Sequence, residues 1–436
     1  MKPVSVGLIG LGTVGAGTVS VLKRNAHEIS RRAGRAIEVR SASVRDLHLS
    51  RACPLEGIEL TQDPYALVED PQIDIIVELM GGLHPALELV LKALDQGKHV
   101  VTANKALIAH HGNEIFAKAQ DRGLMVAFEA AVAGGIPIIK ALREGLSGNT
   151  LEWLAGIING TSNFILTEMR DKGRGFEEVL REAQRLGYAE ADPSFDIDGF
   201  DAAHKLTILA SMAFGIPLQP DRVHVEGLRD ITPLDIAYAE TLGYRIKLLG
   251  IARRMRSGIE LRVHPTFIPH RRLIANVDGV MNAVLVKGDA VGPVLFYGPG
   301  AGAEPTASAV VADLVDVVRT LTSDPENRVP HLAFQPNAIA SLPILSMAEV
   351  ETAYYLRLSA SDQPGVLADV TRILANYQIS IEALLQKEPL EGESQLPIIL
   401  LTHRVLERHL DQALFEIEQL PTISGPVKRI RLETLG

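Results

Sequence analysis

Acidic side chains and a lysine are concentrated between Tyr188 and Lys205. The acidic residues are Glu190, Asp192, Asp196, Asp198 and Asp201. An acidic run that contains proline and glycine is usually a solvated loop. Here aromatic and apolar residues separate the carboxylates, and an apolar helix expected at 202–214 follows them. Because these charges stand against a core, the segment predicts a site that binds a ligand.

Within this segment, Asp201 and Lys205 lie four residues apart at the start of the expected helix. They therefore share one helix face, where a carboxylate also complements the helix dipole. A plain ion pair would explain the two residues. The other acidic residues have no basic partner nearby in the sequence, which favours a cationic ligand such as the ammonium group of an amino acid.

A glycine turn near the N-terminus predicts a second binding site. It stands between an apolar strand and a helix expected to reach about Arg32, and it reads Gly10-Leu11-Gly12-Thr13-Val14-Gly15. In this setting Gly10 permits a tight turn, Gly12 lets a pyrophosphate approach the backbone, and Gly15 lets the helix meet the sheet. The N–H groups at the helix start would bind the phosphates. A turn without a ligand is the alternative, but the strand, turn and helix order favours a dinucleotide.

The second expected strand, Ile37 to Val44, should end where the ribose of the adenosine is recognised. An acidic residue there binds the 2′-hydroxyl of NAD, whereas a basic residue accommodates the 2′-phosphate of NADP. The sequence offers Arg45 and then Asp46. We favour Arg45 and NADP(H), with use of NAD(H) as a second possibility.

Two further apolar strands are expected at 73–79 and at His99–Thr102. Ligands of open α/β sheets lie beyond the carboxyl ends of the strands, so Thr102 and Lys105 are candidates for contact with the cofactor. A surface lysine is the alternative for Lys105. A cation at a helix start is locally unfavourable, however, and a cofactor or a carboxylate substrate would supply a reason for it.

Two turns offer backbone groups to small ligands. Carbonyl groups in the glycine-proline turn at 132–137, just after Glu129, could hold a monovalent cation, and an unliganded hinge is the alternative. Asn159, Gly160 and Thr161 open another helix. They are ordinary capping residues that could also bind the carboxylate of a small substrate.

The order of apolar segments predicts an α/β protein with three domains. Residues 1–133 form a Rossmann-type dinucleotide-binding domain, and 134–304 form an α+β domain for catalysis and dimerisation. Strands near 244–252, 259–267 and 280–286 indicate an antiparallel or mixed sheet that could pair with a second copy. A loop through Gly302 could return the chain to the cofactor, with a helix at 305–321 packing back on the first domain.

A proline-containing linker is expected at 327–352. The remaining segments, 353–436, follow the order strand, helix, strand, strand, helix, strand, which is a ferredoxin-like βαββαβ unit. No catalytic cluster is evident in it. The unit is therefore expected to be regulatory or structural.

Composition narrows the classes of function. The chain has 436 residues, a formal net charge of -10 and a single cysteine, Cys53. The negative charge argues against a nucleic-acid partner. One cysteine cannot form an intramolecular disulfide, which suggests a reducing compartment. No apolar run approaches the roughly 20 residues that span a membrane. We therefore expect a cytoplasmic protein without a membrane partner.

Taken together, the motifs resemble those of monofunctional homoserine dehydrogenases with a C-terminal ACT domain. The resemblance covers essentially the whole chain. Its most specific part is the run from Ala183 to Lys205, and the other matching motifs are 101–105, 159–161 and 362–367.

This resemblance implies a reaction and a set of residue roles. It implies reversible reduction of L-aspartate 4-semialdehyde to L-homoserine with NAD(P)H, in the biosynthesis of threonine, methionine and isoleucine. Lys205 would be the general acid and base, Asp201 would position it, and Lys105 would assist. The substrate would be bound by Glu190, Asp196, Tyr188, Asn159, Gly160 and Thr161. The cofactor would be bound by Gly10, Gly12, Thr13, Val14, Gly15, Arg45, Thr102, Lys105 and Gly302.

The same resemblance implies a monovalent cation such as Na⁺ or K⁺, held by Glu129, Val132, Gly134 and Ile136. It implies a homodimer or homotetramer, and L-threonine as a feedback inhibitor at Asp362, Gln363, Gly365 and Val366. A dimerisation module without a ligand is the alternative for the last domain. Two other functions stay open for the whole chain: another amino-acid dehydrogenase on the same scaffold, or a non-enzymatic sensor of NADPH or amino acids.

Overall fold

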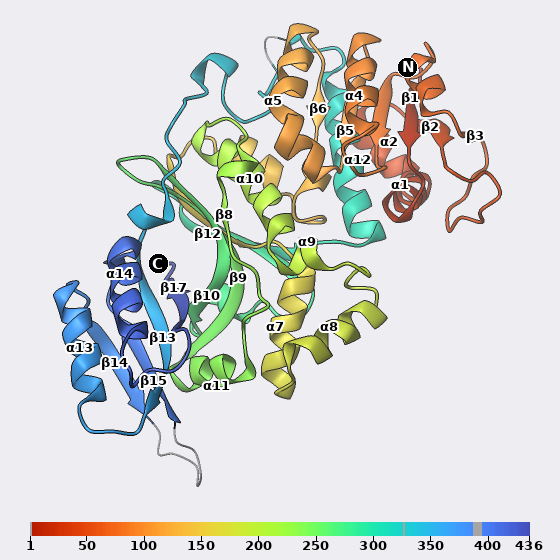
Figure 1. Cartoon of the computed structure of the whole chain (residues 1–436). Coiled ribbons are helices and arrows are strands. Elements are labelled where there is room, and N and C mark those ends of the chain that lie inside the picture. The colour runs from red at the N-terminus through yellow and green to blue at the C-terminus, as the bar shows by residue number, and fades with distance from the viewer. Residues whose placement is uncertain (1, 326–327, 387–394) are drawn as a thin grey trace.

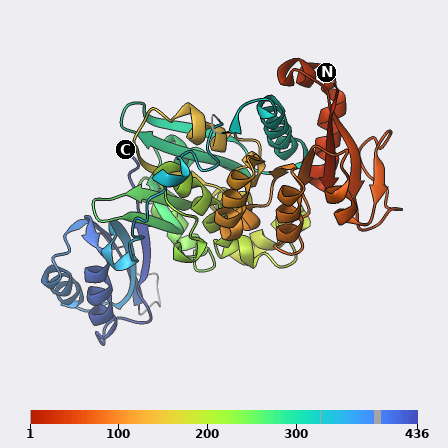
Figure 2. The same cartoon turned by 90° about the horizontal axis from the view of Figure 1, so that it is seen from above.

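The computed structural model of the chain describes residues 2–325, 328–386 and 395–436. Residue 1 of the expected first domain, residue 327 of the expected linker and residues 387–394 of the expected last domain lie outside the described residues. The molecule is elongated (Figures 1 and 2). The N-terminal sheet lies at one end, the C-terminal segments lie at the other, and a second sheet runs between them.

The N-terminal sheet has six strands, and every neighbouring pair in it is parallel. Its spatial order is β3-β2-β1-β4-β5-β6. The strands are β1 (Val4–Ile9), β2 (Ile37–Ser43), β3 (Glu59–Thr61), β4 (Ile75–Glu78), β5 (His99–Thr102) and β6 (Val126–Ala127). The order reverses between β1 and β4, which is where doubly wound sheets bind their ligands.

Helices cover this sheet and bury it between them (Figure 1). They are α1 (Thr13–Arg24), α2 (Ala26–Ala33), α3 (Pro64–Glu69), α4 (Ala86–Asp95) and α5 (Lys105–Asp121). Central strand residues such as Val6 and Leu8 are fully buried, as expected for a parallel sheet covered on its faces. The single helix expected to reach Arg32 is wrong in one detail, because the chain breaks at Asn25 and restarts as α2.

A helix from much later in the chain, α12 (Ala303–Thr320), packs against α1. Gly17 makes the contact possible, because a Cβ there would lie 2.5 Å from the Ala303 carbonyl oxygen. The chain therefore returns to the N-terminal sheet after the middle segments are complete.

The middle segments supply most of a second, eleven-stranded sheet. Its strands from this region are β7 (Leu151–Ile157), β8 (His224–Val225), β9 (Tyr244–Arg254), β10 (Ile259–Pro269), β11 (Met281–Gly288) and β12 (Gly292–Pro299). The helices of this region are α6 (Ile138–Lys140), α7 (Gly160–Lys172), α8 (Phe176–Arg185), α9 (Ser194–Ile197), α10 (Phe200–Phe214) and α11 (Pro233–Thr241). Short helical turns are η1 (Glu129–Ala131), the π-helical η2 (Ala141–Gly145), η3 (Pro220–Arg222) and η4 (Leu273–Asn276).

The C-terminal region is a βαββαβ unit, as the sequence predicted. Its strands are β13 (Glu351–Ser361), β14 (Ile381–Gln386), β15 (Gln395–Thr402), the short β16 (Val405–Leu406) and β17 (Lys428–Leu432). Its helices are α13 (Val366–Asn376) and α14 (Glu407–Glu418). The segment before it contains the short turns η6 (Pro336–Ala338) and η7 (Met347–Glu349).

One sheet joins the middle and C-terminal regions. Its order is β12-β11-β7-β9-β10-β17-β13-β15-β14, with parallel pairing of Thr266 with Arg431 and of Phe267 with Leu432 at the junction of β10 and β17. Buried ion pairs lie beside this junction, where Arg431 contacts Glu226 and Glu407. The C-terminal unit is therefore built into the middle sheet.

The sequence analysis did not predict the short strands β3, β6, β8 and β16, nor the longer strand β12. The glycine-rich run around Tyr297 was expected to be a loop, but residues 292–299 form β12 at the edge of the large sheet, paired with β11. Glycine and proline near both of its ends, together with partial exposure of its middle, hide the strand pattern.

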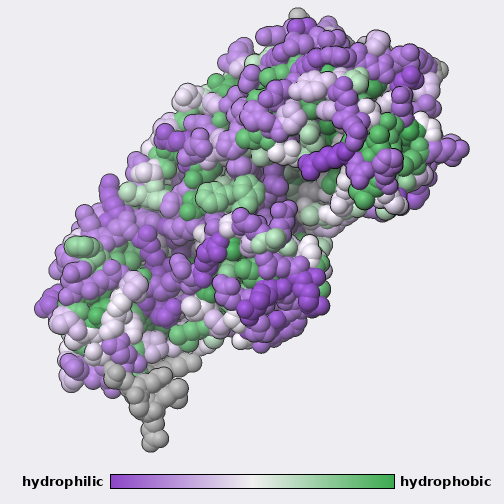
Figure 3. Space-filling view, turned by 45° about the vertical axis from the view of Figure 1, so that its right-hand side comes forward, coloured by the Kyte–Doolittle hydropathy of each residue, from purple (hydrophilic) through white to green (hydrophobic). Residues whose placement is uncertain are grey.

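The surface carries mostly hydrophilic residues, with hydrophobic ones in scattered patches on the face shown in Figure 3. In the described part of the chain, no helix has both the length and the apolar character needed to cross a membrane.

Candidate active site

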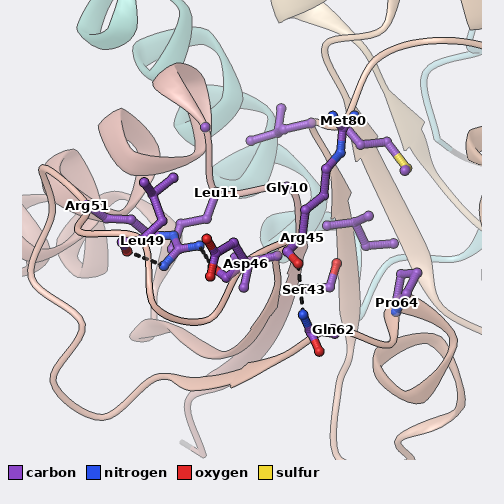
Figure 4. A pocket seen from close by; sticks show the side chains of 14 residues that line it. Gly10, Leu11, Ser43, Arg45, Asp46, Leu49, Arg51, Gln62, Pro64 and Met80 are labelled. Carbon is purple, nitrogen blue, oxygen red and sulfur yellow. Dashed lines mark hydrogen bonds between the residues drawn. The ribbon is translucent and has the colours of Figure 1, made fainter.

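A cavity of about 360 Å³ opens at the carboxyl ends of β1 and β2 (Figure 4). The glycine turn, the end of β2 and the segment after β4 surround it. Its lining includes Gly10, Leu11, Gly12, Ser43, Arg45, Asp46, Leu49, Arg51, Gln62, Pro64, Leu79 and Met80. Gly10, Gly12 and Arg45, which the sequence predicted to bind the cofactor, all line this cavity. Thr13, Val14 and Gly15 do not line this cavity but form the start of α1 beside it.

Each glycine of the turn has a distinct geometry. Gly10 has φ +98°, and a Cβ there would lie 2.8 Å from the Leu79 carbonyl oxygen. A Cβ on Gly15 would lie 2.2 Å from the Gly10 carbonyl oxygen, so only glycine lets α1 approach the turn. Around Gly12 there is open space instead. This opening before the N-terminus of α1 fits a pyrophosphate group, which backbone N–H groups can bind.

After β2, the structure distinguishes the two residues that could recognise the ribose of the adenosine, Arg45 and Asp46. The Asp46 carboxylate accepts the backbone N–H of His48 at 2.8 Å and so supports its own turn. Arg45 is exposed, and its side chain extends toward Met80 across the cavity (Figure 4). Arg51 donates to the Leu49 and Asp46 carbonyl oxygens, which holds the loop on the rim. Arg51 was not predicted, because no local pattern marks it.

A second cavity, of about 470 Å³, lies between the N-terminal domain and the middle region. Predicted residues in its lining are Lys105, Asn159, Gly160, Thr161, Tyr188, Asp196, Asp201, Lys205 and Gly302. The fold brings these residues together from α5, α7, α9, α10 and the start of α12. Residues of its lining that the sequence did not single out include Leu186, Val280, Asn282, Pro299, Gly300 and Ala301.

The Asp201 carboxylate binds both lysines of this cavity. Lys205 Nζ lies 2.7 Å from Asp201 Oδ2 and also donates to the Ile158 carbonyl oxygen at 2.8 Å. Lys105 Nζ lies 3.0 Å from Asp201 Oδ1. Asn159 Nδ2 donates to Asp201 at 2.8 Å. Because Asp201 is only 3% exposed, its charge is stabilised almost entirely by these neighbours.

These contacts shift the pKa values in different directions. Burial acts to raise the pKa of the Asp201 carboxyl group, but Lys205, Lys105 and the hydrogen bonds hold it well below its usual range. Burial lowers the pKa of the Lys205 ammonium group, which Asp201 opposes and Lys105 reinforces. Asp201 raises the pKa of Lys105. The more buried lysine is therefore the one that more readily gives up its proton.

The second carboxylate of the cavity, Asp196, comes from α9. Its Oδ1 accepts from Asn159 Nδ2 at 2.8 Å, and its Oδ2 accepts from Thr161 Oγ1 at 3.3 Å. Burial and the charge of Asp201 raise the pKa of Asp196. Asn159 also caps α7 through the N–H of Ser162, so capping and contact with the site occur together.

Glu190 does not line the second cavity. Its side chain is exposed, and its backbone carbonyl accepts a hydrogen bond from Gln184. Asp201 is the main cause of the raised pKa of Lys105, and the charge of Glu190 adds to it.

A buried carboxylate between the two cavities was not predicted. Glu78 is fully buried at the end of β4, where it accepts the N–H groups of Met80 and Gly81 and the hydroxyl of Thr102. Thr102 in turn accepts the N–H of Asn104, the cap of α5. Thr102 thus links Glu78 to the start of α5, and it lines neither cavity.

The turn expected to hold a cation has its side-chain carboxylate already engaged. Both oxygens of Glu129 accept backbone N–H groups, from Ile139 and Lys140 at 2.8 Å. Each carboxylate oxygen still has a free lone pair, so the Glu129 side chain and the backbone carbonyl groups of the turn are both possible ligands of a cation. Within the described residues, no cluster of three or more His, Cys, Asp or Glu side chains is arranged to hold a metal ion.

Of the expected effector residues, Asp362, Gln363 and Gly365 lie in an exposed loop between β13 and α13, and Val366 is the first residue of α13. Gly365 has φ +98° and stands at the start of α13, while Val366 is buried beneath it. The loop belongs to the C-terminal unit, at the end of the molecule away from the N-terminal sheet (Figure 1).

Comparisons with known proteins follow the same division of the chain. A family model described as homoserine dehydrogenase, NAD binding domain, matches residues 10–129, one described as homoserine dehydrogenase matches 137–315, and an ACT domain model matches 354–422. A homoserine dehydrogenase of Pseudomonas aeruginosa is 63% identical over 436 residues, which is 100% of both chains. The chain belongs to the homoserine dehydrogenase family. A family member from Neisseria gonorrhoeae is 54% identical over 438 residues and is likewise covered over 100% of both chains.

Solved structures of the family agree with this fold. A homoserine dehydrogenase from Thiobacillus denitrificans has 66% identity and a TM-score of 0.95, with 100% of this chain and 99% of that chain covered. A hyperthermophilic archaeal homoserine dehydrogenase, described in complex with NADPH, has 27% identity and a TM-score of 0.61 over 72% of this chain and 98% of its own. The chain thus has a domain that binds a nicotinamide cofactor, and the first cavity is lined almost entirely by residues of the segment that the NAD-binding model matches.

Gly12→Ala should separate binding from folding. A Cβ at this position meets open space in the protein but would occupy the path of the pyrophosphate, so we expect an unchanged melting temperature and at least about tenfold weaker NADPH binding. Titration calorimetry measures the binding. Gly15→Ala is the control, because its clash with the Gly10 carbonyl should lower the melting temperature. Unchanged NADPH binding by folded Gly12→Ala would contradict the assignment of this turn.

Proposed function

We propose that the protein catalyses the reversible reduction of L-aspartate 4-semialdehyde to L-homoserine with a nicotinamide cofactor. The observation that carries this proposal is the pair of lysines on one buried carboxylate, in a cavity next to the cofactor site. Membership of the homoserine dehydrogenase family supports the choice of substrate. The product would enter the biosynthesis of threonine, methionine and isoleucine.

Lys205 is the proposed general acid and base. When bound, the reduced nicotinamide supplies a hydride to the aldehyde carbon. Lys205 then gives a proton to the oxygen of the developing alkoxide, and in the reverse direction it takes the hydroxyl proton. Burial lowers its pKa from the ordinary value of about 10.4, so its neutral, proton-accepting form is reached at lower pH than in an exposed lysine.

Asp201 and Lys105 orient this group. Asp201 fixes the Lys205 side chain from the same helix face, and Lys105 reaches the same carboxylate from the N-terminus of α5. The two ammonium groups attract the carbonyl oxygen of the substrate and stabilise charge that develops on it.

The remaining polar groups would hold the amino-acid end of the substrate. Asp196, with Glu190 at the rim, offers negative charge to the substrate ammonium group. Gly160 and Thr161 present the N-terminus of α7, which favours a carboxylate. Tyr188 would close the outer side of the cavity, where its ring packs against Phe164.

The first experiment is oxidation of L-homoserine with NADP⁺, followed at the nicotinamide absorbance. We expect activity in the wild type and a fall of kcat by a factor of about 10² to 10⁴ in Lys205→Ala, with NADPH binding retained. Lys172→Ala, at the exposed far end of α7, is the control for loss of a lysine. An inactive wild type that binds NADPH would instead favour a sensor, and an active Lys205→Ala would remove Lys205 from the mechanism.

Asp201→Asn should shift the pH dependence. Asp201 opposes the lowering of the Lys205 pKa, so its neutralisation should lower that pKa further. Neutral Lys205 then forms at lower pH, and the ascending limb of kcat/KM for homoserine oxidation should move to lower pH. Asp198→Asn is the matched control, because Asp198 pairs with Arg229 outside the cavity. An ascending limb that stays in place or moves to higher pH in Asp201→Asn argues against this assignment.

We propose NADP(H) as the preferred cofactor, with NAD(H) accepted less well. The support is the exposed Arg45 side chain on the cofactor cavity, while the neighbouring Asp46 carboxylate is used in its own turn.

Arg45→Ala tests the cofactor preference. Loss of a cation that binds the 2′-phosphate should raise KM for NADPH about tenfold and leave KM for NADH nearly unchanged. Initial rates with the two cofactors measure this, with Arg40→Ala, on β2 and outside the cavity, as the control. An equal change for both cofactors would show that Arg45 does not read the phosphate.

We also propose a monovalent cation at the backbone of Glu129, Val132, Gly134 and Ile136. The two backbone N–H groups that the Glu129 carboxylate accepts hold it in place beside the turn, where it could act together with carbonyl oxygens. Equal activity in choline chloride and in NaCl or KCl would argue against it. A homodimer or homotetramer through the middle region is proposed as well, and light scattering on the purified protein measures its mass.

The proposed division of labour follows the expected domains. Residues 1–133, with helix 305–321, would bind the cofactor, 134–304 would carry the substrate and the subunit contact, and 353–436 would regulate. We also propose that the protein is cytoplasmic. The effector would be L-threonine at Asp362, Gln363, Gly365 and Val366.

L-Threonine should lower the rate of homoserine oxidation by the wild type. In Asp362→Ala the inhibition constant should rise about tenfold or more while the uninhibited rate stays the same, because the loop precedes α13 in the C-terminal unit, away from α5 and α10 (Figure 1). Asp369→Ala, which removes an exposed pair with Arg372 on α13, is the control. If threonine changes neither the rate nor any binding signal, the C-terminal unit is a structural module without this ligand.

A further inference from the structure

Asn282 is a buried polar residue in the wall of the second cavity. It is 1% exposed on β11, and its Oδ1 has no hydrogen-bond partner within the described residues. Leaving a buried polar group without a partner destabilises the folded state. The apolar strand around it would accept a hydrophobic residue of similar size without this cost. A ligand in the cavity that completes the hydrogen bonds would explain the asparagine.

The side chain is held in one orientation by a glycine. A Cβ on Gly300 would lie 2.1 Å from both Cγ and Nδ2 of Asn282 and 2.4 Å from Oδ1, so the amide group lies flat against the Gly300 backbone. Any larger residue at position 300 would displace it. Gly300, which the sequence predicted to lie in a loop, thus leaves the space that the Asn282 amide group occupies.

The elements around Asn282 indicate whether the substrate or the cofactor reaches this residue. The Gly300–Gly302 segment leads directly into α12, which packs on α1 of the cofactor domain. Asp196 and Thr161, the proposed partners of the substrate amino acid, come from α9 and α7. Asn282 lies against Gly300 of this segment, while its chain neighbours Val280 and Met281 contact α7, so it stands where the cofactor side and the substrate side of the cavity meet.

In a doubly wound sheet the dinucleotide runs across the switch point, away from the strand that reads its adenosine. With the adenosine end at β2, the nicotinamide end reaches the side of β4 and β5. Lys105, at the start of α5 after β5, lines the second cavity together with Asn282. The nicotinamide ring and the Asn282 amide would thus share this cavity.

We propose that the Asn282 amide binds the carboxamide group of the nicotinamide ring, with Oδ1 accepting one of its N–H groups. This inference rests on the proposed function. A primary amide pairs well with another primary amide, because each offers a donor and an acceptor side by side. The contact would fix the rotation of the ring, so that one face is turned toward Lys205 and the substrate.

The experiment compares NADP⁺ with its 3-acetylpyridine analogue, which keeps the carbonyl oxygen but lacks the amide N–H groups. Dissociation constants are measured by calorimetry on the wild type, on Asn282→Leu and on Asn282→Asp. The wild type should bind NADP⁺ about tenfold more tightly than the analogue, since the analogue leaves Oδ1 unpaired. Asn282→Leu should weaken NADP⁺ binding by about the same factor and bind the two nucleotides equally. Asn282→Asp keeps an acceptor oxygen and should retain part of the discrimination.

Two further variants keep the test decisive. Gly300→Ala displaces the amide without changing Asn282, and it should also abolish the discrimination. Asn276→Leu is the control, because Asn276 is an exposed asparagine that binds only nearby backbone carbonyls. Undiminished discrimination in folded Asn282→Leu overturns the proposal. A rise in KM for homoserine in Asn282→Leu, with nucleotide binding unchanged, also overturns the proposal, because the Asn282 amide would then face the substrate.

These binding measurements do not require turnover. If the wild type failed to oxidise homoserine but discriminated between the two nucleotides as described, the proposed reaction would fall and the Asn282 contact would stand.

Discussion

The Asp201 carboxylate is almost completely removed from solvent, and its charge is stable there because Lys105, Lys205 and Asn159 surround it. Lys105 lies on α5, Lys205 lies on α10, and Asn159 caps α7. The interactions that stabilise this one charge therefore join the parallel-sheet domain to the middle region. Removing one partner of a buried pair typically costs about 3–5 kcal/mol, because the remaining charge is left uncompensated. The same surroundings set the proton affinities of the two lysines in opposite directions. Stability of the interface and chemistry of the site therefore depend on the same contact.

A second set of buried charges lies where the large sheet passes into the C-terminal unit. Arg262 is fully buried and binds Glu260 and Glu433, and Arg431 binds Glu226 and Glu407. Such pairs must match in position, since a shifted strand would leave several charges unpaired at once. The pairs thus favour one register between β10 and β17, where only two residue pairs form the ladder.

Local patterns revealed the parts of the site that lie close together in the sequence. The glycine turn and the Asp201–Lys205 pair follow from fixed spacings, and the structure has both. The contact of Lys105 with Asp201 joins two helices distant in the sequence, so naming both residues did not reveal that they touch. Glu78 and Asn282 each stand alone in an apolar strand, where no neighbour marks them. The single sheet through the middle and C-terminal regions depends on pairing between distant strands, which short-range periodicity does not record.

The place of β17 between β10 and β13 bears on how the chain is made. On the ribosome, β10 is complete long before residues 428–432 appear. During that interval the Thr266–Phe267 stretch, which β17 later covers, presents unpaired backbone groups along an open strand edge. Exposed edges of this kind pair readily with other chains. The nascent protein therefore has a period of vulnerability to misassociation that ends only when its last strand is inserted, and a chaperone that shields strand edges would act in that period.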